Sequence, residues 1–137
     1  MGLNLSFIEI DTRANKPKAT IHITGKLGFN MEAQKLMRLS DDSYYRVALD
    51  EDEEEVTNIY FVASTKDEQG ALKIAKAGQY FYANLTTLFD KLKLDYAKYT
   101  IAFDIEKSKY EDKDMFIFKK RKKDRPRTSE DNSEDGD

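Results

Sequence analysis

Short runs in which hydrophobic and polar residues alternate, or in which every residue is apolar, recur along most of this chain. This is the pattern of strands that bury one or both faces. Glycines, a proline and a run of acidic residues separate the runs and mark turns. The pattern predicts eight strands, at residues 3–10, 19–24, 45–49, 59–62, 72–74, 79–82, 99–105 and 115–118.

Two segments change to the spacing of an amphipathic helix. In residues 30–39 the apolar positions fall on one face, and Asn30 is placed to act as the N-cap. The second helix is expected to have Asn84 as its N-cap and to end near Leu94. Its apolar face repeats at i, i+3, i+4 and i+7, with Leu85, Leu88, Phe89 and Leu92 at these positions.

The predicted elements give the order ββαββ twice, and the two halves are also alike in sequence. Tyr45-Arg46-Val47-Ala48-Leu49-Asp50 matches Tyr99-Thr100-Ile101-Ala102-Phe103-Asp104, and short aromatic strands follow at residues 59–61 and 116–118. We therefore expect a duplication, with copies at about 3–63 and 71–118. The alternative is that any two ββαββ stretches share this periodicity. The expected fold is one α+β, β-rich domain over residues 1–118, with a small barrel-like or swapped-hairpin body.

Charge is segregated at the carboxyl-terminal end. Residues 119–127 contain seven cations and one acid, a net charge of +6, and residues 128–137 carry five acids. Because the whole chain has a formal charge of −3, residues 1–118 carry −4. We expect residues 119–137 to be a disordered tail, basic and then acidic.

The sequence lacks the residues that several classes of chemistry require. The chain has no cysteine, which excludes disulfides and thiolate-bound metals. Its one histidine, His22, has no nucleophile or carboxylate at catalytic spacing, and no phosphate-binding loop is present. The acidic run 50–55 lacks the spacing of a calcium loop. We expect a protein that is not an enzyme, with no catalytic residue, no metal and no cofactor.

No stretch resembles a signal-peptide core or an apolar membrane span, so we expect a cytoplasmic protein that does not enter the membrane.

Tyrosines and lysines of the second half suggest a binding surface. A tyrosine on a sheet can stack on an unpaired base while its hydroxyl stays in water, and nearby lysines can hold phosphates. The alternative is that these aromatic residues pack across strands. The candidate nucleic-acid-binding residues are Lys73, Lys76, Tyr80 and Tyr82, together with a basic arm of Lys119, Lys120, Arg121, Lys122 and Lys123.

The repeated unit resembles the AbrB/MraZ swapped-hairpin family. The resemblance rests on Gly28, Leu39 and the acidic run that begins at Asp50 in the first copy, and on Gly78, Leu94 and Asp104 in the second. It implies two interleaved ββαββ units that bind duplex DNA through basic residues ahead of the helix. Here only Lys26, Lys73 and Lys76 lie in that region, and the family's proline before the helix is absent.

We therefore expect a non-catalytic nucleic-acid-binding accessory or regulatory protein, with single-stranded nucleic acid as one candidate ligand and a mobile element or virus as its source. DNA is favoured over RNA, and the acidic end from Glu130 to Asp137 would modulate the basic arm or recruit a protein partner. The alternative is a protein-interaction or structural module whose acidic body and tail bind another protein or even mimic nucleic acid. The sequence leaves open whether the chain forms a homodimer.

Overall fold

A computed structural model describes residues 2–8, 16–52 and 57–127. Ten strands and two helices follow one another in these residues. Their bounds are β1 Lys18–Ile21, β2 Lys26–Phe29, α1 Met31–Met37, β3 Tyr44–Ala48, β4 Asn58–Ser64, β5 Leu72–Lys73, β6 Ala75–Ala77, β7 Tyr80–Asn84, α2 Thr86–Lys91, β8 Tyr99–Tyr110, β9 Lys113–Lys120 and β10 Arg125–Pro126.

The strands form one antiparallel sheet in the order β5-β3-β4-β9-β8-β1-β2-β7-β6, and β10 pairs with β8. The sheet curls until its two ends approach each other, because β5 and β6 follow one another in the chain with only Ile74 between them. The result is a nearly closed barrel. The expectation of a β-rich α+β protein with a small barrel-like body is confirmed.

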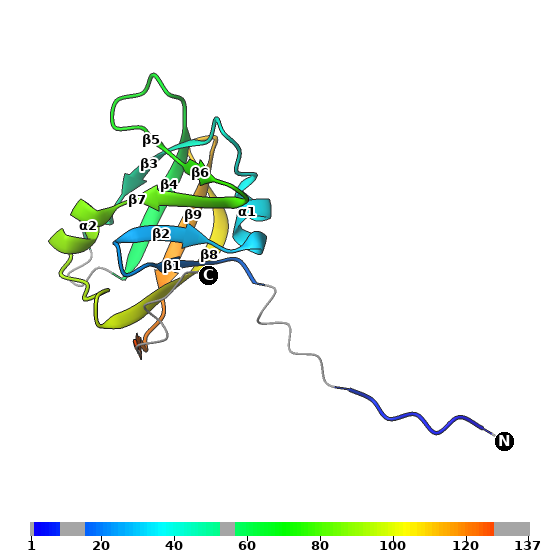
Figure 1. Ribbon diagram of the computed structural model, residues 1–137. Coiled ribbons are helices and arrows are strands. Elements are labelled where there is room, and N and C mark those ends of the chain that lie inside the picture. Colours follow the sequence, from blue (N-terminus) through cyan, green and yellow to red (C-terminus); the bar gives the residue numbers. More distant parts are fainter. Residues whose placement is uncertain (1, 9–15, 53–56, 128–137) are drawn as a thin grey trace.

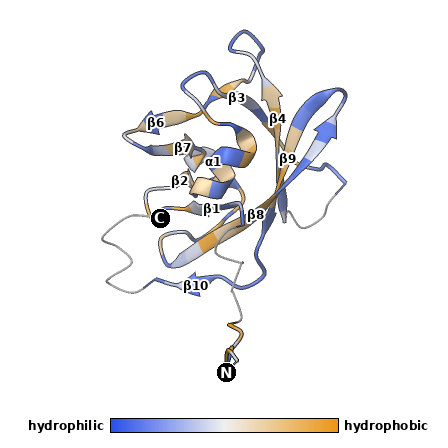
Figure 2. Ribbon diagram, turned by 90° about the vertical axis from the view of Figure 1, so that its right-hand side faces the viewer, coloured by the Kyte–Doolittle hydropathy of each residue, from blue (hydrophilic) through white to orange (hydrophobic). Residues whose placement is uncertain are grey.

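The barrel is filled by aromatic side chains from several strands. Phe61, Phe103 and Phe118 are fully buried, and the rings of Phe61 and Phe118 stack with centroids 4.3 Å apart. The helices lie toward opposite ends of the barrel: α1 lies in the opening seen in Figure 2, and α2 lies at the far left of Figure 1. Each helix adds buried side chains to the same core, Ala33 and Met37 from α1 and Phe89 from α2.

Helix α1 begins where the sequence predicts, because the Asn30 side chain accepts a hydrogen bond from the Ala33 N–H at 2.8 Å. The predicted N-cap of the second helix is displaced by one residue. Leu85 occupies the cap position and is buried, whereas Asn84 ends strand β7. The Asn84 side chain instead accepts a hydrogen bond from the Thr86 hydroxyl at 2.9 Å.

The predicted strand at residues 3–10 does not form in its described part. Residues 2–8 contain no strand, and the side chains of Leu3 and Phe7 are 87% and 92% exposed. Alternation requires a surface to cover the apolar face, and the barrel of the same chain does not provide one for this segment. Residues 9 and 10 lie outside the described residues.

The polar segment 106–114, which separates the predicted strands 99–105 and 115–118, itself forms a strand hairpin. Strand β8 continues to Tyr110, and the turn at Glu111 and Asp112 has φ values of 50° and 72°. Charged side chains suit this hairpin because opposite charges face each other across the strands, as in the 2.9 Å ion pair between Lys109 and Asp114.

The expected domain boundary at Phe118 falls too early. Strand β9 continues to Lys120, and Arg125 of β10 pairs with Thr100 of β8. The Arg127 guanidinium donates hydrogen bonds to the carbonyl oxygens of Tyr96 and Ile21, both at 2.7 Å. The expected disordered tail is therefore wrong for residues 119–127, which fold against β8, and the acidic end 128–137 lies outside the described residues.

Neither helix in the described part of the chain is long and apolar enough to cross a membrane.

Candidate nucleic-acid interface

One side of the barrel carries only positive formal charges. Strands β1, β2, β5, β6 and β7 contain no aspartate or glutamate, and they carry Lys18, Lys26, Lys73 and Lys76. The acidic residues of the body lie on other elements, so its net negative charge is unevenly distributed. A surface of this kind can attract an anionic ligand although the whole molecule is acidic.

The outer surface of this side has a row of small residues with one large ring among them. Strand register places Tyr82 directly between Gly28 of β2 and Ala75 of β6, and Gly28 lies opposite Thr20 of β1. We call the outer surface of β6, β7, β2 and β1 the basic face. Because the neighbours of Tyr82 are small, its ring stands above the strands beside it. The Lys26 ammonium lies over the ring of Tyr82, 4.8 Å from its centroid, a cation–π contact that places a cation on one face of the ring.

A second ring lies over the glycine of this row. A Cβ atom on Gly28 would come within 2.5 Å of Nε2 of His22, so the imidazole rests directly on the glycine backbone. Residue 28 also pairs with Tyr82, so the histidine lies close to the tyrosine on the same surface. The fold thus brings Tyr82 close to His22 and Lys26, which lie far from it in the sequence.

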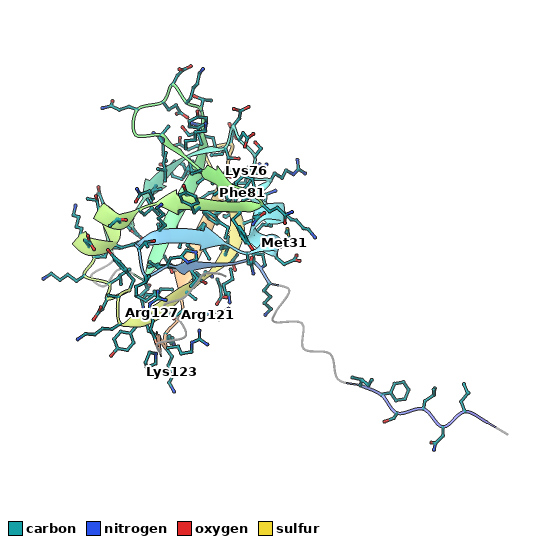
Figure 3. All side chains as sticks on the ribbon, viewed as in Figure 1. Met31, Lys76, Phe81, Arg121, Lys123 and Arg127 are labelled. Carbon is teal, nitrogen blue, oxygen red and sulfur yellow. The ribbon has the colours of Figure 1, made fainter. Side chains whose placement is uncertain are left out.

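Two further candidate residues, Tyr80 and Lys73, lie on this side of the barrel. A third, Lys76, is on the opposite face of its strand. Tyr80 pairs with Ala77, is 69% exposed, and is on the same face of β7 as Tyr82. Lys73 is exposed on β5, next to Tyr44. Lys76 pairs with the inward-facing Phe81, and its ammonium lies 5.8 Å from the centroid of that ring. Figure 3 labels both residues. Lys76 therefore borders the basic face from the opposite side of the edge strand.

The basic arm is placed elsewhere, and three of its five cations have acidic partners. Lys119 pairs with Glu106 at 3.1 Å, Lys120 with Asp124 at 3.0 Å and Arg121 with Asp104 at 2.9 Å. Lys122 and Lys123 are exposed. In Figure 3, Arg121 and Lys123 lie at the lower end of the molecule, whereas Lys76 lies near the top. The structure does not join the arm and the lysines of the second half into one surface.

Three residues of the basic face, Lys18, His22 and Lys26, are absent from the sequence-based candidates. The sequence does contain a signal that could have predicted the basic face: residues 16–31 and 71–89 contain five lysines and no acidic residue. The contact between His22 and Gly28 has no such signal, since it depends on strand pairing.

The largest pKa shifts occur away from the basic face. Burial, with a smaller contribution from Asp114, raises the pKa of Tyr45 to about 12. Hydrogen bonds from Ser64 and Lys113, and then one from the Thr65 N–H, lower the pKa of Glu68 to about 2. Tyr45 is in β3 and Glu68 is in the loop after β4. Both side chains make hydrogen bonds that stabilise the fold, Tyr45 to the Met37 carbonyl and Glu68 to the Ser64 hydroxyl. Within the described residues, no three histidine, aspartate or glutamate side chains gather as they would around a metal ion.

Comparisons of this chain with protein-family models, with curated proteins and with solved structures find no match.

Proposed function

We propose that this chain is a non-catalytic nucleic-acid-binding accessory protein whose basic face holds a single strand. The observation that carries the proposal is the segregation of four lysines, without any acid, on five strands, of which β7 also carries the exposed Tyr80 and the partly buried Tyr82. Lysines on such a surface hold phosphates, and tyrosine rings stack on unpaired bases. A base paired within a duplex presents no free face for this stacking, so the arrangement favours a single strand over a duplex.

Within the basic face we assign the central contact to the pair formed by Tyr82 and His22. Both rings lie on the row that contains Gly28, and Lys26 stands beside Tyr82 with its charge available to a phosphate. One base would stack on Tyr82 and its neighbour on His22 or on the exposed Tyr80. Stacking of this kind tolerates any base, because every base has an aromatic face.

The arm contributes less than its sequence suggests. Ion pairs already engage Lys119, Lys120 and Arg121, so the proposal keeps only Lys122 and Lys123 as additional phosphate contacts. The acidic end from Glu130 to Asp137 stays a candidate competitor for these two lysines, or a site for a protein partner.

We also propose that the barrel arose by duplication of a ββαββ unit. The pairings that support this are reciprocal: β1 pairs with β8 as β5 pairs with β3, while β2 pairs with β7 and β4 pairs with β9. The helix ends correspond as well. Leu39 N–H bonds to the Gln34 carbonyl, and Leu94 N–H bonds to the Phe89 carbonyl, each after a residue with positive φ, Arg38 or Lys93. Interleaved pairing of two such units is also what the resemblance to the swapped-hairpin family implies.

The test is fluorescence anisotropy with labelled single-stranded and duplex oligonucleotides at low salt, using the full chain. We expect Tyr82→Ala to weaken single-strand binding by about 1–3 kcal/mol, the usual value of one stacked base. Lys26→Ala is expected to weaken it less and to reduce its salt dependence. Tyr99→Ala and Lys107→Ala are the matched controls, because they remove a partly exposed tyrosine and an exposed lysine from β8, outside the basic face.

Two results would contradict the proposal. If the unaltered chain binds no oligonucleotide at low salt, the function itself is wrong. If it binds but Tyr82→Ala and Tyr99→Ala behave alike, nucleic acid binds at another surface. A double variant, Lys122→Ala with Lys123→Ala, then tests whether that surface is the arm.

A further inference from the structure

A hollow of about 590 Å³ lies on the outer surface of β3 and β4, away from the strands of the basic face. Its size is that of sites that enclose small ligands or short peptide segments. Val62 and Met115 lie next to each other on its floor, since they are paired across β4 and β9. Tyr60 and Tyr110 also line it, and Gln69 and Gly70 come from the loop that follows β4. We call this hollow the Arg46 groove.

Arg46, which lines the groove, carries an unsatisfied donor. Its Nε atom is buried and has no hydrogen-bond partner, and it is the only such side-chain nitrogen or oxygen in the described residues. Arg46 pairs with Val62, which in turn pairs with Met115, so the guanidinium shares a row with the apolar floor. A buried donor without an acceptor is costly, and such a group usually has a partner in the working form of a protein. The occupant of the groove should therefore offer both apolar side chains and a hydrogen-bond acceptor.

The amino-terminal segment has the complementary features. Leu3, Leu5, Phe7 and Ile8 are 87%, 67%, 92% and 80% exposed. Among the large hydrophobic residues that the structure describes, only Tyr80 is exposed to a similar degree. Residues 2–8 carry no charge and lie clear of the barrel in Figure 1. An extended segment of this kind presents apolar side chains on its faces and backbone carbonyl groups along its edges.

We propose that residues 3–8 of one copy bind in the Arg46 groove of a second copy. The side chain of Phe7 enters the groove beside Met115 and Val62, and a backbone carbonyl of the segment accepts the hydrogen bond from Arg46 Nε. The partner is a second copy because the side chains of the segment bury almost nothing against their own chain. In a two-fold dimer each chain inserts its own segment into the partner and receives the partner's segment. This arrangement would bury the exposed apolar side chains and give Arg46 Nε an acceptor.

A tryptophan at position 7 makes the docking visible. The chain has no tryptophan, so Phe7→Trp provides a single reporter for the segment. We expect its emission to shift to the blue as protein concentration rises. The mass measured by light scattering should rise in parallel from 15.9 kDa to about twice that value.

Variants of the segment and the groove should act alike. Leu5→Ser combined with Phe7→Ser, and separately Met115→Glu, are expected to return the protein to the mass of one chain. Met115 is partly buried on the outer surface of β9, and circular dichroism would verify that Met115→Glu leaves the barrel folded. The matched control is Met31→Ser, which removes a methionine that is 54% exposed at the start of α1 and should leave the dimer intact.

Three results would overturn the proposal. A Phe7→Trp chain of monomeric mass at every concentration, with tryptophan emission typical of water, would show that the segment does not dock. A blue shift without any rise in mass would place the segment on its own chain. A dimer that persists in the Leu5 and Phe7 double variant would use another interface. None of these results depends on nucleic acid, so oligonucleotide binding is tested independently.

Discussion

Gly28 illustrates how a single missing side chain shapes a surface. The position is on the outer face of β2, where a larger residue would normally suit a strand better than glycine. His22 occupies the space that such a side chain would fill, with Nε2 2.5 Å from the position of the absent Cβ. The glycine therefore allows the imidazole to lie flat on the sheet next to Tyr82.

Gly28→Ala should separate stability from binding. The free energy of unfolding should change by less than about 1 kcal/mol, because the imidazole can rotate away and alanine is favoured over glycine in a strand. Single-strand affinity should fall, because the ring that rotates away belongs to the basic face. Anisotropy and urea denaturation measure the two effects.

The control for this substitution is His22→Ala. If the imidazole is the relevant group, Gly28→Ala should have no further effect on affinity in the His22→Ala background. Additive losses from the two substitutions would contradict this explanation.

Glu68 is a residue whose ionisation supports the fold. Its carboxylate accepts hydrogen bonds from the Ser64 hydroxyl at 2.6 Å and from the Lys113 ammonium at 3.1 Å. Its pKa is lowered from 4.5 to about 2, so the folded state favours the charged form. The resulting stability is fully present above about pH 4.5 and is lost as the pH falls toward 2.

Glu68→Gln should therefore destabilise the protein at neutral pH and make its stability less dependent on pH between about 4.5 and 2. Thermal melts at a series of pH values measure this, with Asp67→Asn as the control at the neighbouring exposed position. Parallel pH profiles for the unaltered chain and Glu68→Gln would show that the carboxylate does not contribute.

At the scale of elements, the sequence predicts most strands and both helices, because alternation and helical spacing directly reflect which side of an element is buried. Its errors occur where burial is not local. Residues 3–8 alternate without a covering surface in the chain, and the hairpin formed by β8 and β9 projects polar residues on both faces. The arm also appears independent in the sequence, because its acidic partners Glu106 and Asp104 are supplied by another strand.

Asn30 joins two elements through one side chain. Its carboxamide oxygen accepts hydrogen bonds from the N–H groups of Ala33 at 2.8 Å and Lys18 at 3.0 Å, and its amide donates to the Lys16 carbonyl at 2.9 Å. Asn30→Ala should cost about 1–2 kcal/mol of unfolding free energy, at the upper end for an N-cap, since the start of β1 loses its partners as well.

Urea denaturation measures this loss. Asn84→Ala is the matched control, because Asn84 bonds only to Thr86 in an exposed turn and should cost less. Equal losses for the two asparagines would mean that the link to β1 adds nothing.

At the scale of the whole molecule, the sequence indicates the barrel-like body but not the distribution of charge around it. Net charge alone argues against nucleic acid, and only the folded sheet places Lys18, Lys26 and Lys73 on strands without acids. Tyr80 and Tyr82 therefore remain part of the proposed site and Lys73 and Lys76 lie at its border, whereas most of the arm does not belong to it.

The salt dependence of binding should report the number of lysines involved. For a single strand, the logarithm of the binding constant falls with the logarithm of salt concentration by about 0.7 for each phosphate contact, so three to four contacts predict a slope of about −2 to −3. Lys26→Ala should reduce the magnitude of the slope by about 0.7. An unchanged slope in this variant would remove Lys26 from the interface.

The reciprocal pairing of the strands also has a consequence for protein synthesis. Strand β4 pairs with β9, and strand β1 pairs with β8. Neither pair can form until residues near the end of the folded body have been synthesised. A ribosome adds about 5–20 residues per second, and the 56 positions from Ser64 to Lys120 therefore take about 3–11 seconds. During this interval the nascent chain displays Ile59 and Phe61 on an unpaired edge. A chaperone that recognises exposed apolar strands would find its substrate at this stage of translation.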